Sequence, residues 1–207
     1  MLCFNSGCSF TTNDEHVANE QMYWYMLAKD LGCTSFINHS VPSSSNEEIF
    51  RRIYVHVLEN LDSNVLYFIN ITSTNRIDIV AERTSRMQEI LTKEAIAVYD
   101  YEIRELSLFT QIIGLMSFLD LHKKKFYIIN NSKELSSSQY PLRDRLIDYL
   151  INRPELLNIF KNSKYEFHKN ISKIKPWDYN NYGWAGHDGV TGHYAYYQML
   201  KTLIKVE

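Results

Sequence analysis

The sequence predicts an α/β fold of three layers, in which helices cover both faces of a central parallel sheet. Strand-like and helix-like apolar patterns alternate along most of the 207 residues, the order expected when helices connect parallel strands. The segment 64–71 is almost continuously apolar, as expected of a strand buried on both faces. No composition break, linker or internal repeat divides the chain, so we expect a single domain over 1–207.

Four elements are predicted before the central strand. They are a strand over 2–5, a helix over 17–31, a strand over 34–38 and a helix over 46–61. Apolar residues recur at helical spacing in both helical segments. Asn13 or Asp14 is placed to cap the first helix, and Gly32 to end it. The second helix opens with an acidic turn, which suits the positive end of a helix dipole.

The second half of the chain continues the alternation. We expect helices over 83–91 and 102–121, a strand over 125–130, a helix over 141–160 that breaks before Pro154, and a closing helix over 190–204. The segment 164–184 is aromatic, rich in asparagine and aperiodic, which indicates a loop. Ligands of such folds bind outside the carboxyl ends of the strands. The polar motifs of this sequence follow strand segments or precede the last helix.

Composition and charge narrow the classes of partner. Lys and Arg number 22 against 24 Asp and Glu, so there is no general attraction to nucleic acid or to anionic membranes. No segment approaches ~18 consecutive apolar residues. The short apolar stretch at the start of the sequence has no basic segment before it, unlike a signal peptide. We therefore expect a cytoplasmic protein without a nucleic-acid or membrane partner; no pattern specifies an oligomeric state. Three cysteines and seven histidines lack metal-ligand spacing, so no metal or cofactor is predicted.

A serine near the start of the chain and a histidine near its end could form a nucleophile and base pair. Ser9 stands in the block Gly-Cys-Ser-Phe-Thr, 7–11, directly after the first strand. A serine hydroxyl becomes nucleophilic only beside a base, and its oxyanion needs donors. His187 lies in a glycine-flanked loop before the last helix, which we expect to return toward the first strands.

Together these blocks resemble the SGNH (GDSL-like) hydrolase family, whose serine motif lies near the N-terminus and whose histidine lies near the C-terminus. Residues 7–11 resemble the Gly-Asp-Ser-Leu-Ser/Thr block, with Cys8 in place of aspartate. Residues 187–193 are similar to the His-Pro-x-x-x-Gly-His run. The resemblance implies a flavodoxin-like α/β/α fold, Ser9 as nucleophile with its N–H as an oxyanion donor, and His187 as base. We expect the Cys8 thiol to pack inward.

The blocks that supply the other oxyanion donors depart from the family pattern. After the second strand the family has a glycine whose N–H is the donor, and this chain offers Ser43, or Ser44, in its place. A backbone donor survives any side chain except proline. After the third strand, Thr72 stands where the family has an asparagine. Asn70 and Asn75 are the alternatives to it.

Two further roles follow from the resemblance. Some divergent members have an arginine four residues after the threonine, and Arg76 matches it; it would bind an anionic group of the substrate. The family's aspartate stands three residues before the histidine, where this chain has Trp184. Asp178 or Asp188 could orient His187 instead, and Asp178 is favoured because adjacent side chains seldom face one another.

These residues predict a serine esterase or acyl hydrolase acting on a small-molecule or carbohydrate ester. Trp177 and Tyr179, within the aromatic loop, favour an O-acetylated carbohydrate, because aromatic rings stack on sugar faces. Two alternatives stay open. The domain could be an SGNH-like binding or accessory protein without turnover, or an O-acyltransferase that uses the same acyl-enzyme chemistry.

Overall fold

The computed structural model describes residues 1–12, 17–72, 78–79, 88–89, 101–131, 141–157 and 189–204. Within these ranges the main sheet has five strands in the order β2-β1-β3-β6-β7. They are β1 (Leu2–Ser6), β2 (Ser35–Asn38), β3 (Val65–Ile71), β6 (Lys125–Asn130) and β7 (Leu156–Leu157). Every neighbouring pair is parallel. The four longer strands were predicted from the sequence, and β7 was not.

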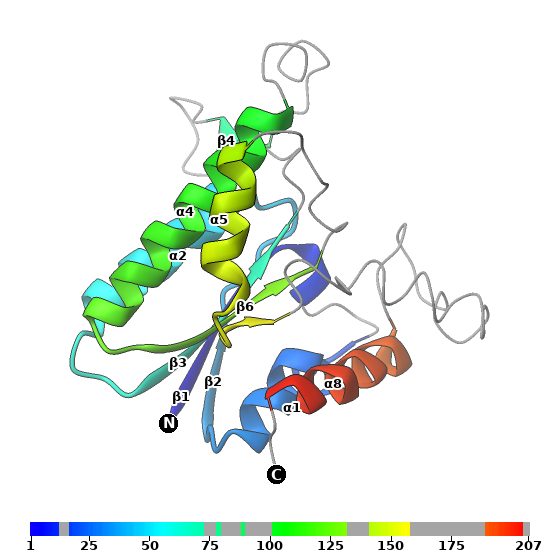
Figure 1. Ribbon diagram of the computed structural model, residues 1–207. Coiled ribbons are helices and arrows are strands. Elements are labelled where there is room, and N and C mark those ends of the chain that lie inside the picture. Colours follow the sequence, from blue (N-terminus) through cyan, green and yellow to red (C-terminus); the bar gives the residue numbers. More distant parts are fainter. Residues whose placement is uncertain are drawn as a thin grey trace.

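Helices cover both faces of this sheet, which confirms the three-layer α/β/α prediction. One face carries α1 (Tyr23–Asp30) and α8 (Val190–Ile204), and the other carries α2 (Asn46–Glu59), α4 (Tyr101–Leu121) and α5 (Pro141–Ile151) (Figure 1). Successive β3 side chains enter opposite cores: Tyr67 packs with α2 and α4, and Phe68 packs with α1 and α8. All seven β3 residues are buried, which explains the continuous apolar pattern.

Helix α1 begins later than predicted, whereas α2 begins at the predicted residue. A 3-10 turn over Asn19–Gln21 precedes α1, and Met22 is extended, so the helix begins at Tyr23 rather than at residue 17. The predicted caps Asn13 and Asp14 lie outside the described residues. Gly32 follows α1 with φ 84°, the left-handed backbone that glycine accommodates. In α2 the Ser45 hydroxyl accepts from Glu48 N at 3.2 Å, a side-chain cap.

Two helix predictions were wrong in part. Gln88–Glu89, predicted as helix, form β5 and pair antiparallel with β4 (Asp78–Ile79); tertiary pairing overrides the helix propensity of Gln and Glu. The helix predicted over 141–160 ends at Ile151. Proline disfavours helix before it, and the chain past Pro154 joins the sheet, with Ile128 N donating to Glu155 O at 2.8 Å. The loop predicted over 164–184 lies outside the described residues.

Candidate active site

Ser9 begins a tight turn at the carboxyl end of β1. The turn is a single 3-10 turn over Ser9–Thr11, preceded by Cys8 in an extended conformation. Thr11 N donates to Cys8 O at 3.0 Å, and so does the hydroxyl of Thr12 at 3.0 Å. Cys8 is fully buried, whereas Ser9 is partly exposed. The turn therefore buries the thiol, as expected, and leaves the neighbouring hydroxyl at the edge of the sheet.

Buried amides fix this turn from the side of the sheet. Asn70 Nδ2 donates to Asn5 Oδ1 at 2.6 Å and to the Ser6 carbonyl at 3.2 Å. Asn5 Nδ2 in turn donates to Asn38 Oδ1 and to Ser40 Oγ, both at 2.9 Å. Both protons of the Asn70 amide are engaged and the residue is fully buried. Asn70 is therefore not the substitute oxyanion donor considered from the sequence.

Arg52 of α2 fixes the turn from the other side. Its guanidinium donates to the Gly7 carbonyl at 3.4 Å and to the His39 carbonyl at 3.1 Å. It also donates to Ser44 Oγ at 2.7 Å and pairs with Glu48. Because Gly7 precedes Ser9 and His39 follows β2, this single side chain ties the Ser9 turn to the loop after β2.

The loop after β2 has one residue in a glycine-like conformation. Ser43 has φ 64°, in the left-handed region that costs a residue with a Cβ roughly 1–2 kcal/mol. It stands at the position where the resemblance places a glycine. The N–H of Ser44 donates to Val41 O at 3.2 Å. Among the described residues, by contrast, no acceptor receives the backbone N–H of Ser9 or of Ser43.

Thr72 ends β3 and is held by Asn46, the first residue of α2. Thr72 N donates to Asn46 Oδ1 at 2.8 Å, and Asn46 Nδ2 donates back to Thr72 O at 3.1 Å. The backbone N–H of Thr72 is thus already used. Its Oγ1 is buried and has no partner among the described groups.

The remaining predicted residues lie outside the described ranges. They are His187, Asp178, Asn75 and Arg76, together with the alternative carboxylate Asp188 and with Trp184, which stands at the position of the family's aspartate. The described chain resumes at Gly189, two residues after His187 in sequence. Gly189 O accepts from His193 N at 3.1 Å, and this bond opens α8. His193 is buried and its ring stacks on Tyr23 at 5.7 Å between centroids.

Sequence reasoning missed most of the side chains that hold the site together. Asn5, Asn38, Tyr23 and Arg52 were not singled out. A signal for the asparagines is present, because all four long strands place an asparagine at or next to their carboxyl ends. Parallel strands bring those ends to one edge of the sheet. The roles of Tyr23 and Arg52 depend on helix packing and leave no comparable signal.

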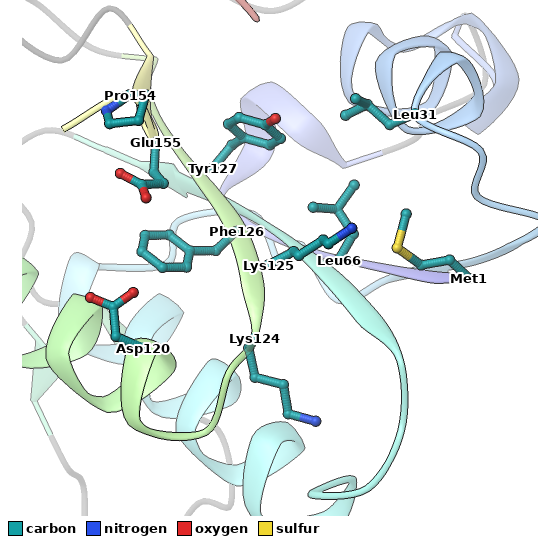
Figure 2. Close-up of a pocket in the computed structure, with 10 residues that line it drawn as sticks. All are labelled: Met1, Leu31, Leu66, Asp120, Lys124, Lys125, Phe126, Tyr127, Pro154 and Glu155. Atoms are coloured by element: carbon teal, nitrogen blue, oxygen red, sulfur yellow. The ribbon is translucent and has the colours of Figure 1, made fainter.

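Three other features of the described residues concern metal binding, membrane spans and a pocket elsewhere in the fold. No group of three or more His, Cys, Asp or Glu side chains in these ranges could hold a metal ion. None of the helices described here has the length and apolar character needed to cross a bilayer. A pocket of about 430 Å³ is lined by Leu66, Lys125 and Tyr127 among others (Figure 2). It lies at the amino end of β6, the opposite edge of the sheet from Ser9.

Known structures share this fold over nearly the whole chain. An acetylxylan esterase from Geobacillus stearothermophilus matches with a TM-score of 0.54 and 13% identity, covering 100% of this chain and 94% of that one. An esterase from a Pseudoalteromonas species, in a form inhibited by monoethylphosphonate, matches with 0.52 and 10%, covering 99% and 96%. A lipolytic protein of the G-D-S-L family from Veillonella parvula matches with 0.51 and 12%, covering 98% and 94%. These similarities confirm the SGNH-type fold.

No protein-family model matches the sequence, and a comparison with curated proteins gives no match.

Proposed function

We propose that this protein is a serine esterase or acyl hydrolase in which Ser9 is the nucleophile and His187 the base. The observation that carries the proposal is the Ser9 turn. It carries Ser9, a partly exposed residue, just past the carboxyl end of β1, and within the described residues nothing accepts from the backbone N–H of Ser9 or of Ser43. Esterases among the structural neighbours support the same reaction class.

In this mechanism the Ser9 hydroxyl attacks the carbonyl carbon of an ester while His187 takes its proton. The N–H groups of Ser9 and Ser43 donate to the oxyanion of the tetrahedral intermediate. The alcohol leaves with the proton from His187, and Ser9 is left acylated. Water, deprotonated by the same imidazole, then attacks the acyl-enzyme and restores the hydroxyl.

The substrate proposed is an acetyl ester of a carbohydrate. The acetylxylan esterase among the neighbours supports this class, and so does the aromatic segment that contains Trp177 and Tyr179. Thr72 Oγ1, Asn75 and Arg76 are proposed to contact the substrate. Asp178 is proposed to accept from His187 and so to hold the imidazole in its reactive tautomer.

Covalent labelling tests the nucleophile. A fluorophosphonate should label the wild-type protein, and mass spectrometry should place the adduct on Ser9. Ser9→Ala and His187→Gln should lower kcat on p-nitrophenyl acetate by roughly a thousandfold or more. The matched control is Ser35→Ala, on the exposed start of β2, which should label and turn over normally. An adduct on any other residue, or labelling that persists in Ser9→Ala, would refute the proposal.

The same assays distinguish an esterase from a binding protein and from an acyltransferase. They also test which carboxylate orients His187. A wild-type protein that binds an acetylated xylo-oligosaccharide but neither labels nor turns over is a binding protein. One that labels, yet releases product only when a sugar acceptor is added, is an acyltransferase. Asp178→Asn should lower kcat by roughly 10²-fold or more, whereas Asp188→Asn should leave it unchanged; the reverse result would reassign the orienting carboxylate to Asp188.

A further inference from the structure

The phenol of Tyr23 contacts residues of β3 and of the segment after β6, at the same carboxyl edge of the sheet as Ser9. Tyr23 is the first residue of α1, and it is completely buried. Its hydroxyl lies 2.5 Å from Asn70 Oδ1, in β3, and 2.8 Å from Asn131 Oδ1, directly after β6. In the described ranges no charged side chain takes part in these two contacts.

The proton count of this network fixes its direction. A phenol has one proton, so it can donate to one of the two oxygens. Asn131 Nδ2 is buried without a partner in the described part of the chain. Turning the Asn131 amide would let Nδ2 donate to the phenol oxygen, and the phenol would then donate its one proton to Asn70 Oδ1. From Asn70 the network continues to Asn5 Oδ1 and to the Ser6 carbonyl.

The ring of Tyr23 packs against α8, the helix that follows His187 in sequence. It stacks on His193 with an interplanar angle of 18° and meets Tyr196 edge-on at 5.0 Å. Both partners belong to α8, which lies beside α1 in the same core (Figure 1). His193 is in the first turn of that helix, six residues after His187 in sequence. One buried side chain therefore contacts both the support of the Ser9 turn and the start of the helix that follows the proposed base.

We infer that Tyr23 is a positioning residue for the proposed reaction. Its hydroxyl, through Asn70, sets the Ser6 carbonyl and hence the turn that carries Ser9, while its ring sets the first turn of α8. This inference rests on the proposed esterase function. A displacement of about 1 Å between reacting groups can cost as much as 10²-fold in rate. Removing the hydroxyl therefore slows the chemical step and leaves binding unchanged.

The test is Tyr23→Phe, which deletes the hydroxyl and keeps the ring. On p-nitrophenyl acetate kcat should fall about tenfold with KM unchanged, and the rate of fluorophosphonate labelling should fall by the same factor. The matched control is Tyr67→Phe. Tyr67 is also fully buried in the sheet, but its hydroxyl bonds His56 Nδ1 at 3.1 Å on the opposite face. This control should lower the melting temperature as much as Tyr23→Phe and leave kcat unchanged.

Each outcome decides the inference. If Tyr23→Phe keeps kcat within about twofold of wild type, or if Tyr67→Phe loses as much activity, Tyr23 has no positioning role and the esterase proposal stands. An inactive, unlabelled wild-type protein refutes both together. If Tyr23→Phe does not fold, Asn131→Ala removes the phenol's second hydrogen-bond partner and should lower kcat two- to threefold at constant KM. An unchanged kcat in that variant overturns the inference.

Discussion

Replacing Gly7 with alanine tests whether the Ser9 turn is as tightly enclosed as its contacts indicate. A Cβ at residue 7 would overlap Thr11 Oγ1, and it would lie 2.9 Å from Asn70 Cβ and 3.3 Å from Ser40 Oγ. Thr11 cannot turn aside freely, because its hydroxyl lies 2.8 Å from Ser40 Oγ and donates to Cys8 O at 3.2 Å. Asn70 is held by its own hydrogen bonds. The added methyl group therefore displaces the turn itself.

The magnitude follows from these contacts. Overpacking of a buried site costs about 1–3 kcal/mol, and each hydrogen bond that Thr11 loses costs about 1 kcal/mol more. We expect Gly7→Ala to destabilise the protein by roughly 3–5 kcal/mol, which for a chain of this length lowers the melting temperature by roughly 10 °C. Because Ser9 is two residues further along the same turn, kcat/KM on p-nitrophenyl acetate should fall at least about tenfold.

Calorimetry and the esterase assay on three variants check this reasoning. Thr11→Ala alone should cost about 1–2 kcal/mol through its lost hydrogen bonds. The double variant Gly7→Ala/Thr11→Ala should be more stable than Gly7→Ala, because the worst overlap is gone. A Gly7→Ala protein that melts within about 1 °C of wild type, or a double variant that is the least stable of the three, would show that the turn is not enclosed in this way.

Three further predictions concern other parts of the fold. Ser43→Gly should stabilise the protein by up to about 1 kcal/mol in urea denaturation while keeping the N–H donor, since the left-handed backbone favours glycine; a loss of stability would contradict it. Lys124→Met should cost about 2–3 kcal/mol, because the ammonium donates to three carbonyls beyond the end of α2 at 2.7–2.9 Å; an unchanged urea midpoint would show that these bonds add nothing. Burial lowers the pKa of His56 below its ordinary 6.5, so the unfolded chain binds more protons there. The stability that neutral His56 contributes is fully present above about pH 6.5 and is lost as the pH falls through the lowered pKa of the folded protein. His56→Gln should therefore lose less of its free energy of unfolding than wild type between pH 7 and pH 5.5. An equal loss in both proteins would refute the assignment.

The sheet could be predicted because its strands are buried on both faces. The run Val-Leu-Tyr-Phe-Ile in β3 has no polar face, which indicates a strand covered on both sides. Its alternate side chains enter two separate cores, and helices on each side of the sheet complete those cores. The short strands β5 and β7 could not be predicted. Each has two residues and exists through pairing with another strand, β4 for β5 and β6 for β7, so its own sequence is too short to carry a strand pattern.

The position of Ser9 was predictable for a similar reason, and the network around it was not. A glycine directly after a buried strand indicates a turn at the edge of the sheet, and the structure has that turn. The partners of Asn70 are distant in sequence: Tyr23 lies 47 positions and Asn5 lies 65 positions before it. Which amide faces which carbonyl is decided by strand register and helix packing, and neither is visible in a local motif.

Two departures from the SGNH pattern that the sequence resembles, at Cys8 and at Ser43, fall where the backbone rather than the side chain meets the structural requirement. Cys8 replaces an aspartate, yet what the turn uses at this position is the carbonyl, which accepts from Thr11 and Thr12 while the thiol is buried. Ser43 replaces a glycine and still has the left-handed φ of 64°. A turn specified by main-chain hydrogen bonds tolerates such exchanges at a cost of about 1–2 kcal/mol. A comparison of amino-acid sequences, in contrast, no longer detects the motif once its side chains have changed. The same fold can therefore be recognised in three dimensions at 10–13% identity although no family model matches the sequence.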